Sequence, residues 1–223
     1  MDQAYHAVRR HLLRGAPGRV SRRRLAAELG VSQACVQAAL GRLEGEGLLE
    51  TRPQSGTHIR VVDIAEYHRV YDLRELLESY AAGRAATRIT ARQLARIDRA
   101  LAAHAAQVAV IARGRGPKPT RAEVTPAITA QHTFHDTILE AADNPTAHHF
   151  VENLRILSYY ARFARSWSRP ELLSQLRKAL TEHTAIADAL RAGRADDAER
   201  LMREHIRTSR FWPSADDAGD PAR

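Results

Sequence analysis

The chain has 223 residues, which is long for one domain and comfortable for two. Its 34 Lys and Arg exceed its 26 Asp and Glu, and the net charge of +8 favours a polyanionic partner such as nucleic acid. The single cysteine, Cys35, excludes an internal disulfide, and every apolar run falls short of the roughly 20 residues that span a bilayer. We therefore expect a cytoplasmic protein without a membrane partner.

Three short helices are predicted in the first 45 residues. Apolar residues at helical spacing predict a first helix over residues 3–13, ended by the glycines and proline of residues 15–18. A second helix over residues 21–29 and a third over residues 32–45 each begin at a serine, a residue type that caps helix N-termini. Gly30 supplies the turn between them, so the segment has the layout of a helix-turn-helix.

A β-hairpin is predicted after the third helix. Strand-like runs between Leu48 and Val62 flank the turn residues 53–56, and the rest of the chain has no comparable strand signal. A helix-turn-helix followed by a two-stranded wing is a DNA-binding module that places one helix in the major groove. Residues 1–62 are therefore predicted to form a winged helix-turn-helix domain.

Basic and polar side chains gather in this module. Seven arginines lie between Arg9 and Arg24 without an acidic residue among them, as expected of a surface that neutralises phosphates. Glutamines at the start of the third helix suit the N6 and N7 edge of adenine. We predict DNA contacts from the second helix, the third helix and the wing, through Arg22, Arg23, Arg24, Ser32, Gln33, Gln37, Arg42, Gly56, Thr57 and His58.

The remainder of the chain is predicted to be a helical domain over residues 67–212, reached through a linker of residues 63–66. The Gly- and Pro-rich residues 113–121 are expected to form a mobile loop, and residues 213–223 a disordered tail. Amphipathic periods, caps and breakers predict helices over residues 67–87, 90 to beyond 111, 125–142, 146–164, 168–193 and 196–211.

The first domain resembles the GntR family of winged-helix repressors. The resemblance implies a homodimer on a two-fold operator, and it places Arg23 at a position where the family contacts phosphates or bases. The family usually has arginines where this chain has Gln33 and Gln37, so a different operator sequence is expected. The matching residues are Gly15, Pro17-Gly18, Leu25-Ala26, Leu29-Gly30-Val31-Ser32, Val36, Ala39-Leu40, Arg42-Leu43-Glu44, Glu46-Gly47-Leu48 and Pro53-x-x-Gly56.

The second domain resembles the FCD domain of the FadR subfamily over about residues 67–211. This resemblance implies an all-α antiparallel helical bundle that senses small organic acids. Members that bind metal use three histidines and an Asp four residues before the first of them. In this sequence the histidines fit as His135, His183 and His205, with Gln131 at the Asp position. The other matching residues are Leu73-Arg74-x-x-Leu77-Glu78, Phe134, Asn144-Pro145, Glu182, Ala198, Met202 and Ile206.

The same histidines stand out without the family. Each of His135, His183 and His205 falls on the apolar stripe of its own predicted helix, so all three should point into one bundle. One such histidine is more often a hydrogen-bonded core residue, but three that converge favour a divalent metal of the zinc or nickel class. Gln131 should face the same place from one turn away, although an amide oxygen is a weaker ligand than a carboxylate. The other eight histidines are expected at the surface or at helix ends.

Arg74 has two possible roles. It can present its charge to a carboxylate effector beside the metal, as the resemblance implies, or form a surface ion pair with Glu78 at i+4. The sequence leaves both open.

These observations predict a DNA-binding transcriptional regulator, a repressor rather than an enzyme, whose operator affinity responds to a small carboxylate. The alternative is a zinc-dependent hydrolase built on the same three histidines. It lacks a convincing base, because Glu182 and Glu204 each precede a ligand histidine directly and are turned about 100° away on the helix. A third possibility, an architectural DNA-binding protein without a ligand, would leave the polar residues of the bundle unexplained.

Overall fold

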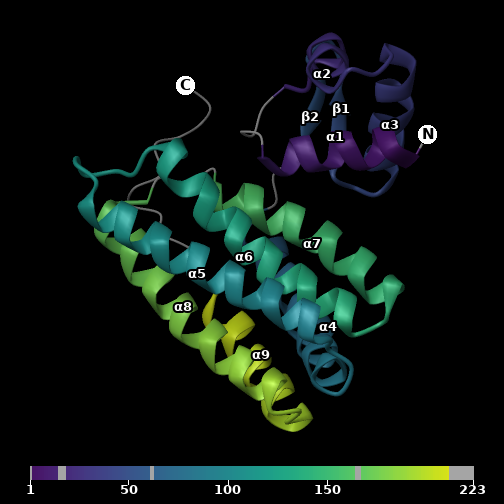
Figure 1. The fold of residues 1–223 in the computed structure, drawn as a ribbon. Helices are drawn as coiled ribbons and strands as arrows, with labels where there is room; N and C mark the ends of the chain where they lie inside the picture. Colours follow the sequence, from purple (N-terminus) through teal and green to yellow (C-terminus); the bar gives the residue numbers. More distant parts are fainter. Residues whose placement is uncertain (1, 15–18, 61–62, 164–166, 211–223) are drawn as a thin grey trace. The chain divides into compact units, whose positions relative to one another are not determined.

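The computed structural model describes residues 2–14, 19–60, 63–163 and 167–210 (Figure 1). It divides into two compact units, one of residues 1–67 with 153–164 and the other of residues 68–152 with 165–223. The predicted stop of the first helix at residues 15–18, the end of the hairpin at Val62 and the tail at residues 213–223 lie outside the described residues.

The first unit holds the predicted helix-turn-helix and wing. Its elements are α1 (Asp2–Arg14), α2 (Arg22–Leu29), α3 (Gln33–Gly45), β1 (Leu49–Arg52) and β2 (Gly56–Ile59). Helix α3 packs against α1, α2 and β1, so it is the centre of this unit. Its core includes Leu25, Val36, Leu40 and Leu43, which are 0–3% exposed, whereas Leu29 is partly exposed.

Local chemistry explains how the helix-turn-helix forms. Ser21 and Ser32 cap α2 and α3 by accepting hydrogen bonds from the backbone amides of Arg24 and Cys35. Gly30 ends α2 with φ +65°, in the left-handed region that favours glycine. The wing is an antiparallel hairpin in which Leu49 pairs with Ile59 and Arg52 with Gly56.

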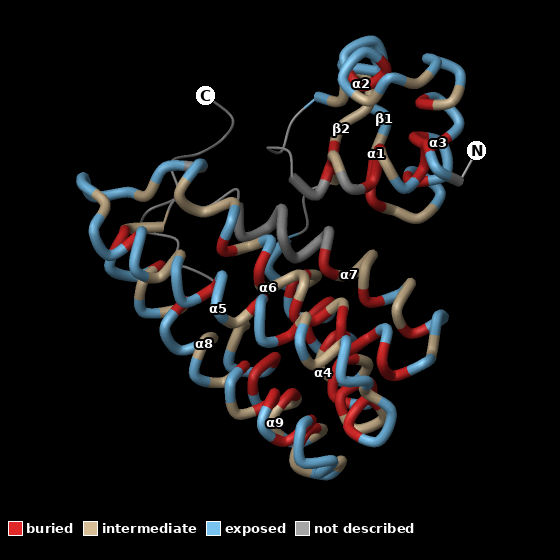
Figure 2. The backbone as a smooth tube through the Cα atoms, in the orientation of Figure 1, coloured by how far each residue is buried: buried red, intermediate tan, exposed pale blue. Residues whose placement is uncertain are grey.

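The second unit is built from helices. Figure 1 shows α5 (Ala91–Arg113) beside α6 (Arg121–Ala141) and α8 (Arg169–Arg191), and α8 also packs against α9 (Ala195–Thr208). The remaining helices are α4 (Ile64–Ala86) and α7 (Pro145–Phe163), which also reach into the first unit. Buried residues alternate with exposed ones along these helices (Figure 2), and one buried cluster joins α4, α6 and α7 through Ala81, Leu139, Ala142 and Val151. Among the described residues, no helix combines the length and apolarity that crossing a bilayer requires.

Two predicted helix starts are wrong. Helix α4 begins at Ile64 rather than Tyr67, because the Asp63 carboxylate accepts the backbone amide of Glu66 at 2.7 Å, so most of the predicted linker is helical. Helix α6 begins at Arg121 rather than Thr125, because Thr120 and Glu123 form a reciprocal capping box. Pro126 therefore lies inside α6 instead of opening it.

The predicted mobile loop between α5 and α6 is instead anchored. Arg169 is 8% exposed, and its guanidinium donates to the Glu123 carboxylate and to four backbone carbonyls. A guanidinium has five N–H donors in a rigid fork, so one side chain can satisfy a segment that has no apolar core of its own. The hydrogen bond from Arg169 also lowers the pKa of Glu123 to about 2. The four carbonyls belong to Ile111, Arg115, Gly116 and Lys118.

Candidate nucleic-acid interface and metal centre

The arginines of α2 form an exposed basic turn. Arg22, Arg23 and Arg24 are consecutive, all exposed, and follow directly after the Ser21 cap. An exposed helix N-terminus with three guanidinium groups attracts phosphates through both its backbone amides and its side chains. All three are exposed, and their contacts with DNA stay a prediction.

The start of α3 presents the predicted base-reading residues. Ser32 caps the helix, while Gln33 and Gln37 are exposed and lie one turn apart on the same face. Arg22 Nη1 donates to Gln37 Oε1 at 2.7 Å, which ties α2 to α3. Because its oxygen is bound in this way, the NH₂ group of Gln37 is the part left to act as a donor, and its contact with a base edge stays a prediction.

Arg42 has an intramolecular role that the sequence did not indicate. Its guanidinium lies 3.9 Å from the centre of the Tyr5 ring, and its Nε donates to Glu46 Oε1 at 3.2 Å. Tyr5 donates its hydroxyl to the other oxygen of Glu46, and burial together with this bond raises the pKa of Tyr5 to about 12. These contacts join α1 to α3, and a DNA contact by Arg42 stays a prediction.

The wing residues are partly committed to the hairpin itself. The Thr57 hydroxyl pairs with that of Thr51, and His58 Nε2 lies 2.8 Å from the Ser55 hydroxyl. Gly56 has φ +87°, and a Cβ there would come within 3.1 Å of Arg19 Nε. Arg19 is exposed and was not singled out from the sequence, although it belongs to the predicted arginine block.

One arginine of that block does not face solvent. Arg9 is 3% exposed, and its Nη2 donates to Asn153 Oδ1 within the same unit at 2.6 Å. Its assignment to phosphate neutralisation is therefore wrong. The cause is that Arg9 lies on the buried face of α1, beside Val8 and Leu12.

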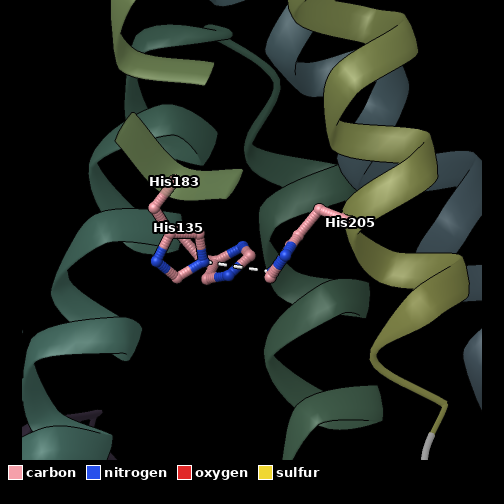
Figure 3. A group of neighbouring side chains, drawn as sticks. All are labelled: His135, His183 and His205. Carbon is pink, nitrogen blue, oxygen red and sulfur yellow. Dashed lines mark hydrogen bonds between the residues drawn. The ribbon is translucent and has the colours of Figure 1, made fainter. Parts of the chain in front are cut away.

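The structure brings the three predicted histidines together inside the second unit. His135 comes from α6, His183 from α8 and His205 from α9, and Figure 3 shows their rings converging. All three are at most 5% exposed, and one potential ligand atom from each lies within 4.8 Å of the others. The Nε2 atoms of His183 and His205 are 3.1 Å apart.

Two carboxylates lie against the Nδ1 atoms of two of these histidines and orient their rings. Glu78 Oε2, on α4, lies 2.6 Å from His135 Nδ1, and Glu182 Oε2 lies 2.8 Å from His205 Nδ1. A proton on Nδ1 facing a carboxylate makes Nε2 the nitrogen that can bind a cation, the arrangement that fixes histidine ligands in metal sites. Sequence reasoning missed both roles. Glu182 is turned away from its neighbour His183, as expected, and for that reason it reaches His205 on the adjacent helix.

The environment of His183 keeps its imidazole neutral. It is fully buried, and this burial, together with the charges that His205, His135 and His104 would carry, holds its pKa well below the ordinary value. Its ring stacks on Phe134 at 4.2 Å. Within the described part of the chain, His183 Nδ1 has no hydrogen-bond partner. Neutral imidazole is the form that ligates metals, so His183 can bind a cation without first losing a proton.

His104 is a fourth buried histidine that the sequence placed at the surface or at a helix end. It is 1% exposed on α5, with its ring centre 5.8 Å from that of His183. Burial lowers its pKa to about 4, against the opposing effect of the Leu176 backbone. A local signal could have found it, because His104 lies seven residues after Ile97 and seven before Ile111, on the buried stripe of α5.

Arg74 and Gln131 complete the predicted site residues. Arg74 Nε lies 2.8 Å from Glu78 Oε1, and both side chains are buried, so the ion pair exists but is not at the surface. The guanidinium also lies 4.7 Å from the centre of the Tyr71 ring. Gln131 is partly buried on α6, one turn before His135.

The donor set fits a borderline divalent cation. Three imidazoles with two carboxylate partners resemble the nitrogen-rich sites that hold zinc or nickel, and no thiolate is present to favour a softer metal. Three protein ligands leave coordination positions for a further oxygen donor.

Comparisons with protein families assign each unit separately. Residues 1–59 match the family described as bacterial regulatory proteins, gntR family, and residues 69–208 match the FCD domain family. Together these matches span nearly the whole described chain.

Individual relatives agree with the family matches. The HTH-type transcriptional repressor RspR of Escherichia coli is 27% identical over 210 residues, covering 92% of this chain and 85% of that protein. The putative L-lactate dehydrogenase operon regulatory protein of the same organism is 28% identical, covering 82% and 73%. Among solved structures, E. coli McbR/YncC superposes with a TM-score of 0.73 at 19% identity, covering 92% of both chains, which shows a shared fold. A putative GntR regulator from Rhodococcus sp. RHA1 gives a TM-score of 0.70, also at 19% identity, covering 94% of each chain.

Proposed function

The chain belongs to the GntR family of bacterial regulatory proteins and carries an FCD domain, and we propose that this DNA-binding transcriptional regulator is a metal-dependent repressor. In this proposal it binds a two-fold operator as a homodimer, and a small carboxylate held near the metal changes its operator affinity. The observation that carries the proposal is the buried cluster of His135, His183 and His205 with its two carboxylate partners.

Operator recognition is proposed to divide between two helices. The arginines of α2 position the unit on phosphates, and Gln33 and Gln37 at the start of α3 read base edges. One winged helix buries too little DNA surface for tight specific binding, which supports two copies on one operator. The relative RspR is named a repressor, which supports the same direction of control.

The metal is proposed to bind the three histidines, and Gln131 is the proposed fourth ligand. A bound divalent ion would supply positive charge for a carboxylate oxygen. The protein's own contribution is to exclude water by burial, to hold His183 neutral and to fix the rings of His135 and His205 through Glu78 and Glu182. None of these tasks requires a catalytic base.

The proposed route to the DNA runs through α4. Glu78 contacts both Arg74 and His135, so a change of charge at the metal would act on α4, the helix that carries Glu78 and Arg74. This helix begins four residues after Arg60. A carboxylate effector would compete with Glu78 for Arg74, and a ligand shifts an equilibrium only through different affinities for two states. One relative is named for the operon of L-lactate dehydrogenase, whose substrate is a small hydroxy acid, which supports this class of effector.

The hydrolase alternative gains no support. The relatives are named as transcriptional regulators, and both oxygens of Glu182 are committed, one to His205 and one to the Thr208 hydroxyl. Glu204 is exposed and pairs with Arg200. Neither carboxylate is positioned to activate a water molecule at the histidines.

The decisive experiment combines metal analysis with operator binding. Protein purified without chelator or affinity tag should hold close to one equivalent of zinc or nickel. Operator DNA selected from a random pool should then bind with an affinity that small carboxylates change by about 5- to 150-fold, the usual scale of such coupling. Arg74→Ala should abolish this response and leave unliganded binding nearly unchanged, while the exposed Arg99→Ala serves as the control. Less than a tenth of an equivalent of metal, or an equal response in Arg74→Ala, would contradict the proposal.

A further inference from the structure

Helix α5 carries two polar residues, His104 and Gln107, that neither site explains. They lie three residues apart on one face of the helix, and His104 is 1% exposed. Among the described residues, neither ring nitrogen of His104 has a hydrogen-bond partner, and the same holds for the buried Gln107 Oε1. The large majority of buried polar atoms in folded proteins are paired, so three such atoms on one helix face call for a functional explanation.

His104 lies against His183 but outside the group of candidate metal ligands. The centres of the two rings are 5.8 Å apart and their planes are inclined at 63°. The ligand atoms that lie within 4.8 Å of one another belong to His135, His183 and His205, and His104 supplies none of them. His104 is therefore placed to act on the metal through His183 rather than to bind the metal itself.

His183 differs from the other two histidines of the cluster in what its second nitrogen faces. Glu78 and Glu182 orient the rings of the other two. Within the described part of the chain, His183 Nδ1 has no hydrogen-bond partner, while its Nε2 lies 3.1 Å from His205 Nε2. A neutral imidazole that binds a cation through Nε2 carries its proton on Nδ1. Metal binding would therefore leave a buried N–H donor on His183 that needs an acceptor.

The unpaired atoms on α5 and α8 are complementary to one another. Burial lowers the pKa of His104 to about 4, so its ring is neutral, with one bare nitrogen and one N–H. The bare nitrogen is the acceptor that His183 Nδ1–H lacks, and the N–H is the donor that Gln107 Oε1 lacks. Two hydrogen bonds would thus pair all four atoms. The backbone of Leu176, which opposes the lowering of this pKa, is outside hydrogen-bond geometry with either nitrogen.

We propose that His104 is a positioning residue for the metal centre, which accepts a hydrogen bond from His183 Nδ1–H and is itself oriented by Gln107. The inference rests on the metal of the proposed function and gives the third histidine ligand its orienting partner. That partner is uncharged, so it fixes the ring of His183 without adding a third carboxylate to the buried site. It also couples α5, which supplies none of the three histidines, to metal binding.

Zinc titration of the metal-free full chain tests this role. His104→Leu removes both ring nitrogens, so zinc affinity should fall by about 10- to 100-fold, the usual effect of losing such a partner. At pH 7 the metal-free variant should unfold at or above the parent's temperature, because leucine replaces a buried polar ring that has no partner there. Ile97→Ala, on the same buried stripe of α5, is the matched control, and it should lower stability but leave zinc affinity unchanged.

Two further variants separate hydrogen bonding from packing at this position. The amide of asparagine reaches about as far as Nδ1 of a histidine, and that of glutamine about as far as Nε2. One of His104→Asn and His104→Gln should therefore restore most of the zinc affinity that His104→Leu loses. The variant that does so identifies the nitrogen of His104 that faces His183.

The outcomes separate the role of His104 from the metal site itself. A parent that does not bind zinc would overturn the metal of the proposed function and this inference with it. A parent and a His104→Leu variant that bind zinc equally well would overturn the role of His104 alone. A loss in His104→Leu that neither amide variant restores would do the same, because the loss would then come from packing.

Discussion

The side chains proposed to read DNA and those proposed to hold metal differ in their exposure to water. Arg23, Gln33 and Gln37 are exposed on the outside of the first unit, whereas His135, His183 and His205 are at most 5% exposed inside the second. An exposed side chain contributes little to folding, so changing it should alter DNA affinity alone. A buried one is also part of the core, so changing it should alter ligand binding and stability together.

The largest effect is expected for His183→Ala. It removes a ligand and a buried ring that stacks on Phe134, so the variant should lose at least about 100-fold in metal affinity. Its metal-free form should also lose about 2–4 kcal/mol of unfolding free energy through the cavity. Isothermal titration with zinc and thermal unfolding measure the two losses, with the exposed His68→Ala as the control. Normal metal affinity in His183→Ala would show that the cluster is only a packed core.

A smaller effect is expected for Glu182→Gln, which keeps the shape of the side chain and removes the charge behind His205. Loss of such a partner typically weakens metal binding by about 10- to 100-fold. Glu204→Gln is a matched control, because Glu204 also precedes a cluster histidine directly but is exposed and pairs with Arg200. Equal zinc dissociation constants for the two variants would show that Glu182 does not position His205 for metal binding.

Among the exposed residues of the first unit, Gln37→Ala and Arg23→Ala should separate base reading from phosphate binding. Gln37→Ala should reduce discrimination at one base pair by about 1–3 kcal/mol. Arg23→Ala should weaken binding to all sequences and reduce the slope of log affinity against log salt by about one. Both should unfold at the parent's temperature. An unchanged base preference in Gln37→Ala, measured on a randomised operator pool, would remove it from the reading surface.

The smallest effect concerns pH and uses His104. Its pKa is about 4 in the folded protein and about 6.5 in the unfolded chain, so its contribution to stability is complete above pH 6.5 and is lost as the pH falls towards 4. Between pH 7 and pH 5 this amounts to about 1–2 kcal/mol. Metal-free His104→Leu should show a correspondingly shallower loss of unfolding free energy over this range. A slope identical to that of the parent would mean that folding does not lower the pKa of His104.

Sequence reasoning succeeded where the determining signal is local. Caps at Ser21 and Ser32, the turn at Gly30 and the hairpin residues all act within a few positions, and each is found as predicted. The three histidines were also found, because each marks the apolar face of its own helix. Their meeting in space follows once those faces share one core.

Sequence reasoning failed where the determining contact joins residues that are far apart in the sequence. The partnership of Glu182 with His205 depends on the packing of α8 against α9, and that of Glu78 with His135 on the packing of α4 against α6. Neither of these two helix packings can be inferred from the sequence spacing of the residues. The Asp63 cap of α4 and the capping box of α6 are local signals, but Asp63 was assigned to a linker and Pro126 was taken as the start of α6.

The hydrogen bonds of Arg169 control when the segment between α5 and α6 becomes accessible to a protease. The segment from Arg113 to Arg121 is rich in sites that trypsin recognises, yet its carbonyls are bound by a residue about fifty positions later in the chain. Cleavage there requires the N-terminal turn of α8 to release its guanidinium first, because a protease needs an extended, unbonded backbone. The rate of proteolytic cleavage in this segment therefore reports partial unfolding at the start of α8.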